Sequence, residues 1–159
     1  MDQPIGRDTP RSQCTYYRQV CDLAARIDPP ELGRIVVNAS QVWGLTMPAV
    51  LGRDVSYQMR KANTAVGPVV AQLRSARWTF LVRPDIPDEA ELFAEMFRNS
   101  VSVTRDNAPI ALPSPTETSR EIRQWIERPT DSFRPSGMVV INAIRACVGT
   151  GRRRKAVRL

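Results

Sequence analysis

Histidine is absent from all 159 residues, and its absence excludes a large part of enzyme chemistry. Ser-His-Asp and Cys-His mechanisms need an imidazole as the general base, and many zinc sites need one as a ligand. Lysine, another side chain that can act as a base, is nearly absent, since Lys61 and Lys155 are the only two. We therefore expect no nucleophilic catalysis by serine or cysteine.

Cysteine is also scarce, because the chain has only Cys14, Cys21 and Cys147 and no C-x-x-C pair. Cys14 and Cys21 are seven positions apart, which on one helix corresponds to a rise of about 10 Å. A disulfide needs Cα atoms within about 7 Å of each other. We therefore expect buried, reduced thiols, which fit the cytoplasm.

Long apolar runs and phosphate-binding loops are missing. No segment approaches the roughly 20 apolar residues that cross a bilayer, and the first 30 residues do not resemble a secretory signal. Neither G-x-G-x-x-G nor G-x-x-x-x-G-K-[ST] occurs. We expect a cytoplasmic protein that binds no nucleotide through such a loop.

Positive charge is present in excess, and most of the excess is at the C-terminus. The formal net charge is +7, from 23 basic and 16 acidic residues. The last eight residues contain no acid, so without their five basic residues the net charge of the remainder is only +2. Such a tail favours contact with polyanions. Its basic residues are Arg152, Arg153, Arg154, Lys155 and Arg158.

Hydrophobic periodicity predicts three helix–hairpin units followed by two helices. The helices are expected at Ser12–Ile27, from Pro48, after Glu89, between Thr118 and Pro129 (with a Thr118–Glu121 capping box), and up to a stop at Gly149. The hairpins are expected to pair Ile35–Asn38 with Val42–Met47, Gly67–Arg74 with Arg77–Arg83, and Ser100–Thr104 with Pro109–Leu112.

These elements predict a single compact α+β domain at residues 12–149, in which antiparallel β-hairpins pack against helices and two helices stand at the C-terminal end. A flexible N-terminus at 1–11 and a basic C-terminal tail at 150–159 are expected to flank it.

Five acids between Asp85 and Glu95 are a candidate metal or acid/base site. Helical spacing places Asp88, Glu91 and Glu95 on one face, opposite the apolar side of the same helix. We interpret them as a solvated helix surface and expect no metal and no cofactor. The apolar side is expected to bury Leu92, Phe93, Met96 and Phe97.

The second hairpin brings Arg74, Arg77 and Trp78 together at its turn. Two arginines beside an aromatic ring can hold phosphates and stack a base. In the alternative interpretation, Trp78 and Phe80 face the core and the arginines are merely solvated.

Three short motifs lie in the middle of the chain: Gly67-Pro68-Val69-Val70, Arg77-Trp78-Thr79-Phe80-Leu81-Val82 and Leu112-Pro113-Ser114-Pro115. Together they resemble the later part of the primase–polymerase-like domains of high-GC actinobacteria, over about a third of the chain. The catalytic signature of that family is a strand-borne acidic pair, a histidine and a further acid, and this sequence lacks the histidine and a matching pair. The resemblance thus implies a reduced, non-catalytic relative that contacts nucleic acid.

Three hypotheses about function follow. The first, which we expect, is a non-enzymatic cytoplasmic module that binds the phosphates of DNA or RNA through the basic tail and the arginine-bearing hairpin. The second is a protein-interaction or regulatory domain, such as a homodimer, with no nucleic-acid role. The third is a metal-dependent nucleotidyl-transfer enzyme that uses Asp85 or Asp88. A membrane partner is not expected, because the tail carries no apolar or lipid anchor.

Overall fold

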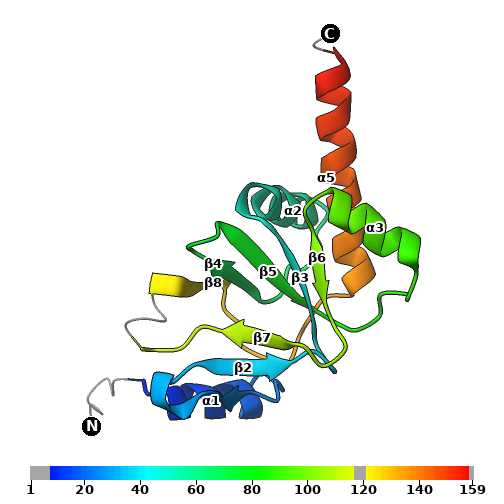
Figure 1. The fold of residues 1–159 in the computed structure, drawn as a ribbon. Coiled ribbons are helices and arrows are strands. Elements are labelled where there is room, and N and C mark those ends of the chain that lie inside the picture. The colour runs from blue at the N-terminus through cyan, green and yellow to red at the C-terminus, as the bar shows by residue number, and fades with distance from the viewer. Residues whose placement is uncertain (1–7, 117–120, 158–159) are drawn as a thin grey trace.

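Two antiparallel sheets form the centre of the structure, a computed structural model that describes residues 8–116 and 121–157 (Figure 1). The larger sheet has the strand order β6-β3-β5-β4-β8 and the smaller one the order β1-β2-β7. The strands are β1 (Arg26–Ile27), β2 (Ile35–Asn38), β3 (Trp43–Pro48), β4 (Val69–Gln72), β5 (Arg77–Val82), β6 (Ser102–Thr104), β7 (Pro109–Leu112) and β8 (Arg123–Glu127).

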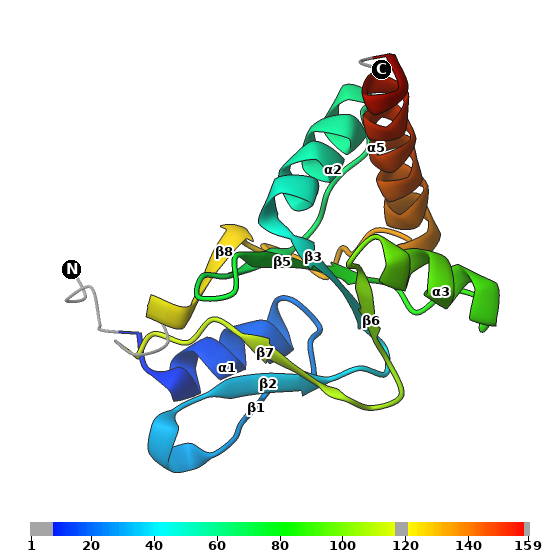
Figure 2. The ribbon, with the colours of Figure 1, turned by 45° about the horizontal axis from the view of Figure 1, so that its top comes forward.

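Helices cover both faces of the larger sheet. On one face lie α2 (Ala49–Lys61), α3 (Ala90–Arg98) and α5 (Gly137–Val157), while α1 (Pro10–Gln19) and the smaller sheet lie on the other (Figure 2). A short 3-10 helix, η1 (Pro30–Leu32), joins β1 to β2. The predicted α+β class with antiparallel sheets is confirmed.

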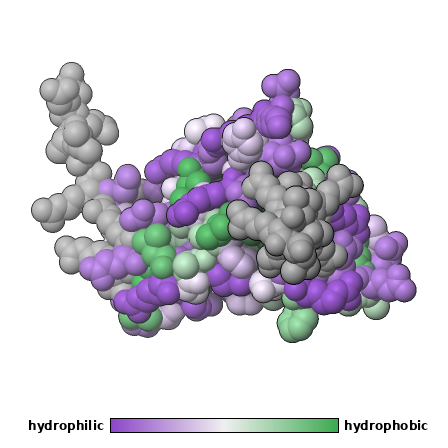
Figure 3. Space-filling model, turned by 90° about the horizontal axis from the view of Figure 1, so that it is seen from above, coloured by the Kyte–Doolittle hydropathy of each residue, from purple (hydrophilic) through white to green (hydrophobic). Residues whose placement is uncertain are grey.

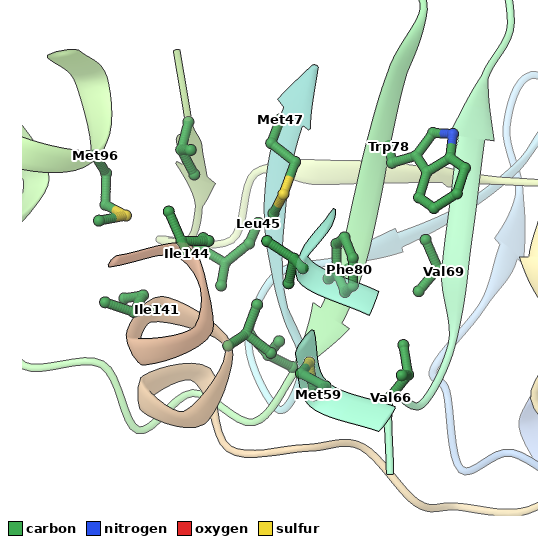
Figure 4. Packing of buried hydrophobic residues seen from close by; sticks show 14 of the residues in the cluster. Leu45, Met47, Met59, Val66, Val69, Trp78, Phe80, Met96, Ile141 and Ile144 are labelled. Carbon is green, nitrogen blue, oxygen red and sulfur yellow. The ribbon is translucent and has the colours of Figure 1, made fainter. Parts of the chain in front are cut away.

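Each face of the larger sheet has its own apolar cluster, because the side chains of a strand alternate between faces. Trp78 and Phe80 of β5 belong to the cluster under the helices, whereas Leu81 belongs to the cluster that faces α1. Phe80 lies in the same cluster as Leu45 from β3 and Ile144 from α5 (Figure 4). The core therefore extends through the sheet as two layers.

The hairpin of β4 and β5 forms as predicted. The two strands pair antiparallel with Gln72 opposite Arg77, and Leu73 to Ala76 make the turn. Ala76 has a φ of +52°, a left-handed value that helps the chain reverse. An aromatic and β-branched second strand made this hairpin predictable.

The other two predicted hairpins are wrong. β2 pairs with β1 and β7, while β3 pairs with β5 and β6, so strands that are neighbours in sequence lie in different sheets. The linker between β2 and β3 contains no Asn-Gly or Asp-Gly turn, and its Ala39 instead bonds to the loop before β7. Likewise, β6 belongs to the larger sheet and β7 to the smaller one, so these two strands do not pair.

The helix expected between Thr118 and Pro129 is wrong over Arg123–Glu127, which form strand β8 along β4, whereas Glu121 and Ile122 are helical. Trp125 points to the α1 side, where its indole N–H donates to the Tyr17 hydroxyl at 2.9 Å. Thr118, the expected cap, lies outside the described residues. Among the described residues, strand β8 therefore precedes the long helix α5, where two C-terminal helices were expected.

Three helix boundaries differ from the prediction. α1 begins at Pro10 with Thr9 as its cap, so the expected flexible N-terminus already contains its first turn. It ends at Gln19 rather than Ile27, since Asp22 follows with a φ of +51°. α5 does not stop at Gly149 but runs on to Val157, as an isolated helical glycine costs only about 1 kcal/mol relative to alanine.

Phe97 does not join the core, in contrast to the prediction. It is 80% exposed on α3, while Leu92 and Met96 of the same helix are buried. The cysteines are free thiols, Cys14 and Cys21 buried and Cys147 half-buried.

Candidate nucleic-acid interface

Arg74 lies exposed in the turn between β4 and β5. Within the described part of the chain its guanidinium has no hydrogen bond or ion pair. Of the three predicted hairpin residues it is therefore the one that presents a guanidinium to solvent.

Arg77 has a structural role. Its Nη2 donates to the carbonyl of Thr46 at 3.1 Å and to that of Ser100 at 2.8 Å. These bonds tie the start of β5 to β3 and to the segment that leads into β6. A guanidinium has five N–H donors, so Arg77 keeps donors for a further acceptor while its position is fixed.

Trp78 is a core residue, and the alternative interpretation of the hairpin holds for it. Its side chain is 9% exposed and packs under α2, where a Cβ on Gly52 would come within 2.8 Å of the ring. The guanidinium carbon of Arg53 lies 5.9 Å from the ring centroid. A ring so covered cannot stack on a base, which removes Trp78 from the interface.

The basic segment at the C-terminus is partly described. Arg152, Arg153, Arg154 and Lys155 are in the helical backbone of α5, whose C-terminal part leads away from both sheets (Figure 1). Successive positions of an α-helix are about 100° apart, so four in a row go around most of the axis. Arg158 lies outside the described residues.

Two arginines outside the predicted sites act on each other electrostatically. They are Arg34, just before β2, and Arg123, the first residue of β8. Burial lowers the pKa of Arg123, and the positive charge of Arg34 lowers it further. The Nε atom of Arg123 is buried and has no hydrogen-bond partner. No local signal marked this pair, since it is formed by segments far apart in sequence.

Arg123 also continues a polar row across the larger sheet. Gln72 of β4 is paired with Arg77 of β5 on one side and with Arg123 of β8 on the other. Alternation along the strands puts all three on the face toward the smaller sheet, because Val70 and Trp125, two positions away, pack in the cluster on that face. The row lies at the hairpin end of this face.

The acids around α3 take part in bonds that hold the fold. The Asp85 carboxylate accepts from the backbone N–H of Gly137 at 2.7 Å, and Asp88 pairs with Arg105 at 3.0 Å. Glu95 accepts from both Nε and Nη2 of Arg145, which joins α3 to α5 and raises the pKa of Arg145. These acids therefore do more than solvate a helix face, and they point to different partners.

The thiols lie in protected surroundings. Burial raises the pKa of the Cys21 thiol. Burial also raises the pKa of Cys147, and the nearby Asp54 adds to the increase. Both thiols are held in their unreactive, protonated form at neutral pH.

Within residues 8–116 and 121–157, no group of three or more His, Cys, Asp or Glu side chains is arranged to hold a metal ion. No helix in the same ranges has the length and apolar character that a membrane span requires. No protein-family model, no curated protein and no solved structure matches this chain. The resemblance to primase–polymerase-like domains therefore stays a prediction.

Proposed function

We propose that this protein is a non-enzymatic, nucleic-acid-associated module of the cytoplasm that binds phosphates through its basic C-terminal segment. The observation that carries the proposal is the concentration of charge, with five basic residues and no acid among the last eight. Four of these five positions belong to a helix that leads away from the body of the domain. A cationic helix of this kind suits phosphate contacts that do not depend on base sequence.

The hairpin supplies a secondary contact in this proposal. Arg74 is exposed at the turn, and Arg77 has donors left beyond its two carbonyl bonds. The resemblance over Gly67–Pro115 supports the same function, as that range includes β4 to β7. Trp78 has no part in it because its ring is buried.

Enzymatic nucleotidyl transfer is not part of the proposal. Asp85 caps the start of α5, and Asp88 pairs with Arg105, so the two acids serve different partners. The sequence also lacks the histidine of the family that it resembles.

A protein-interaction domain, such as a homodimer, is the second candidate, and exposed apolar side chains favour it. Val50 and Tyr57 on α2 are exposed, as is Phe97 on α3. Figure 3 shows that hydrophilic residues make up most of the upper face, with apolar residues between them. Concentration-dependent association without nucleic-acid binding would identify this second function.

Fluorescence anisotropy with labelled single-stranded and duplex DNA tests the proposal, over about 50 to 200 mM salt. If all five basic residues contact duplex phosphates, the log–log slope is about −4.5, or roughly 500-fold in affinity across that range. A variant with glutamine at all five positions keeps the helix propensity and removes the charge.

The expected result is that this variant loses both the binding and the salt slope. Glutamine at Arg74 and Arg77 serves as the comparison, and we expect it to reduce the slope by less than 2 units, as about 0.9 is lost per phosphate contact. A steep slope that survives in the five-glutamine variant would move the interface away from the tail. Absence of binding at low salt would contradict the proposal.

A further inference from the structure

The Nε–H group of Arg123 is a buried hydrogen-bond donor without an acceptor. It begins β8, on the face of the larger sheet that looks toward the smaller one, and its Nε is buried without a hydrogen-bond partner. A buried charged donor without a partner is costly. A side chain in this state marks a position that a ligand can satisfy.

Arg34 supplies a second positive charge, which acts on Arg123. Its Nε donates to the carbonyl of Asp28 at 2.8 Å, which orients the guanidinium and leaves both Nη groups for other acceptors. Neither Arg34 nor Arg123 forms an ion pair with any carboxylate in residues 8–116 and 121–157. Burial is the main cause of the lowered pKa of Arg123, and repulsion from the like charge of Arg34 lowers it further.

The backbone just before Arg34 is closely packed, which fixes where this residue begins. Gly33 has a φ of +61°, and its carbonyl accepts from the buried Ser114 hydroxyl at 2.7 Å. A Cβ at Gly33 would come 2.9 Å from Pro10 and 3.0 Å from Thr116, which shows how closely the start of α1 and the end of the β7 segment pack here.

We propose that Arg34 and Arg123 form an oxyanion site that takes a phosphate group. The planar fork of arginine matches the oxygens of phosphate, and a phosphate held by both guanidinium groups supplies the negative charge that no carboxylate of the described residues supplies to them. A bound phosphate accepts from the buried Nε and cancels the repulsion between the two cations. This site is separate from the basic C-terminal segment and goes beyond the proposed function.

The test measures the thermal stability of the full chain in sodium phosphate against sodium chloride at equal ionic strength. Phosphate also stabilises proteins by exclusion from their surface, so the site-specific part needs a baseline. Arg98→Gln provides it, because Arg98 is exposed on α3 and the substitution removes the same charge. Arg123→Gln and Arg34→Gln remove one guanidinium each from the proposed site.

Two results together support the site. In chloride, Arg123→Gln unfolds at the same temperature as the wild type or a higher one, because it removes a repelled, unpartnered cation. In phosphate, the wild type and Arg98→Gln are stabilised, and the apparent phosphate affinity of both site variants is weaker by about tenfold or more. An equal phosphate response in all four proteins would overturn the proposal. If Arg123→Gln does not fold, Arg34→Gln, whose side chain is more exposed, decides on its own.

A second experiment, competition between inorganic phosphate and labelled DNA, identifies the source of the phosphate group. Inorganic phosphate that displaces labelled DNA from the wild type, together with weaker DNA binding in Arg123→Gln, identifies a nucleic-acid phosphate. Phosphate binding that Arg123→Gln abolishes while DNA binding stays unchanged identifies a small phosphorylated molecule. Because the five-glutamine tail variant leaves this site intact, failure of the tail proposal and failure of this one are distinguishable.

Discussion

Asp85 and Gly137 are joined by a hydrogen bond of 2.7 Å from the Gly137 N–H to an Asp85 carboxylate oxygen. The bond connects the segment that leads into α3 with the first turn of α5. Gly137 is also pressed against Ile86, where an added Cβ would come within 2.5 Å of the side chain. The start of α5, and therefore the direction in which its basic end extends, depends on this contact.

Replacing Asp85 by alanine is expected to destabilise the protein by about 1 kcal/mol, because the first turn of α5 loses a charged cap. The midpoint of urea unfolding measures the loss. Asp85→Asn keeps an acceptor and should lose less. Glu91→Gln, an exposed neutralisation on α3, is the control and should stay within about 0.5 kcal/mol of the wild type. An unchanged midpoint for Asp85→Ala would mean that this bond does not contribute to stability.

Two helical glycines should respond to alanine with opposite signs. A Cβ at Gly52 would lie 2.8 Å from the Trp78 ring, whereas one at Gly149 would meet nothing within 4 Å. We expect Gly52→Ala to cost about 1–3 kcal/mol through overpacking. Gly149→Ala should instead stabilise by up to about 1 kcal/mol, since alanine favours the helix. Thermal unfolding of both variants checks the pair, and destabilisation by Gly149→Ala would argue against a continuous α5.

Tyr17 connects three elements through one hydroxyl group. It donates to the Pro113 carbonyl at 2.7 Å and accepts from the Trp125 indole at 2.9 Å. Tyr17→Phe leaves both partners unsatisfied in the core and should cost about 1–3 kcal/mol. Tyr57→Phe, at an exposed position on α2, is the matched control and should have almost no effect. Equal unfolding midpoints for the two variants would exclude this role of the hydroxyl.

The buried thiols predict a loss of stability at alkaline pH. The ordinary pKa of a cysteine is 9.0, and burial raises that of Cys21 and Cys147 in the folded protein. The unfolded chain therefore loses these protons first as the pH rises, and the folded state becomes less stable from about pH 9.0 upward. Unfolding in urea as a function of pH measures this loss. The double variant Cys21→Ala, Cys147→Ala should show a smaller decline, and an identical decline would assign the effect to other groups such as Tyr17.

Local sequence patterns predicted correctly the elements whose conformation depends mainly on their own residues. The β4–β5 hairpin was predictable because Arg77 to Val82 are aromatic and β-branched and a short turn precedes them. In contrast, Ile122, Trp125 and Ile126 fit helical spacing as well as a half-buried strand. Trp125 and Ile126 lie in a strand because β8 pairs with the free edge of β4, and this long-range contact is not visible in the local sequence.

The same limit applies to the candidate sites. Basic residues in sequence order, such as Arg152 to Lys155, are visible without a structure. The electrostatic influence of Arg34 on Arg123 arises only after β2 and β8 take their places in different sheets. The burial of Trp78 likewise depends on α2 lying over β5, which no local pattern encodes.

The position of β8 has a consequence for the protein during its synthesis. β4 and β5 leave the ribosome well before β8, so the outer edge of β4 has unpaired N–H and C=O groups for that interval. Such an edge can pair with the same edge of another nascent chain. A chain interrupted before Arg123 would keep this edge open for good, and we expect it to aggregate where the complete chain does not.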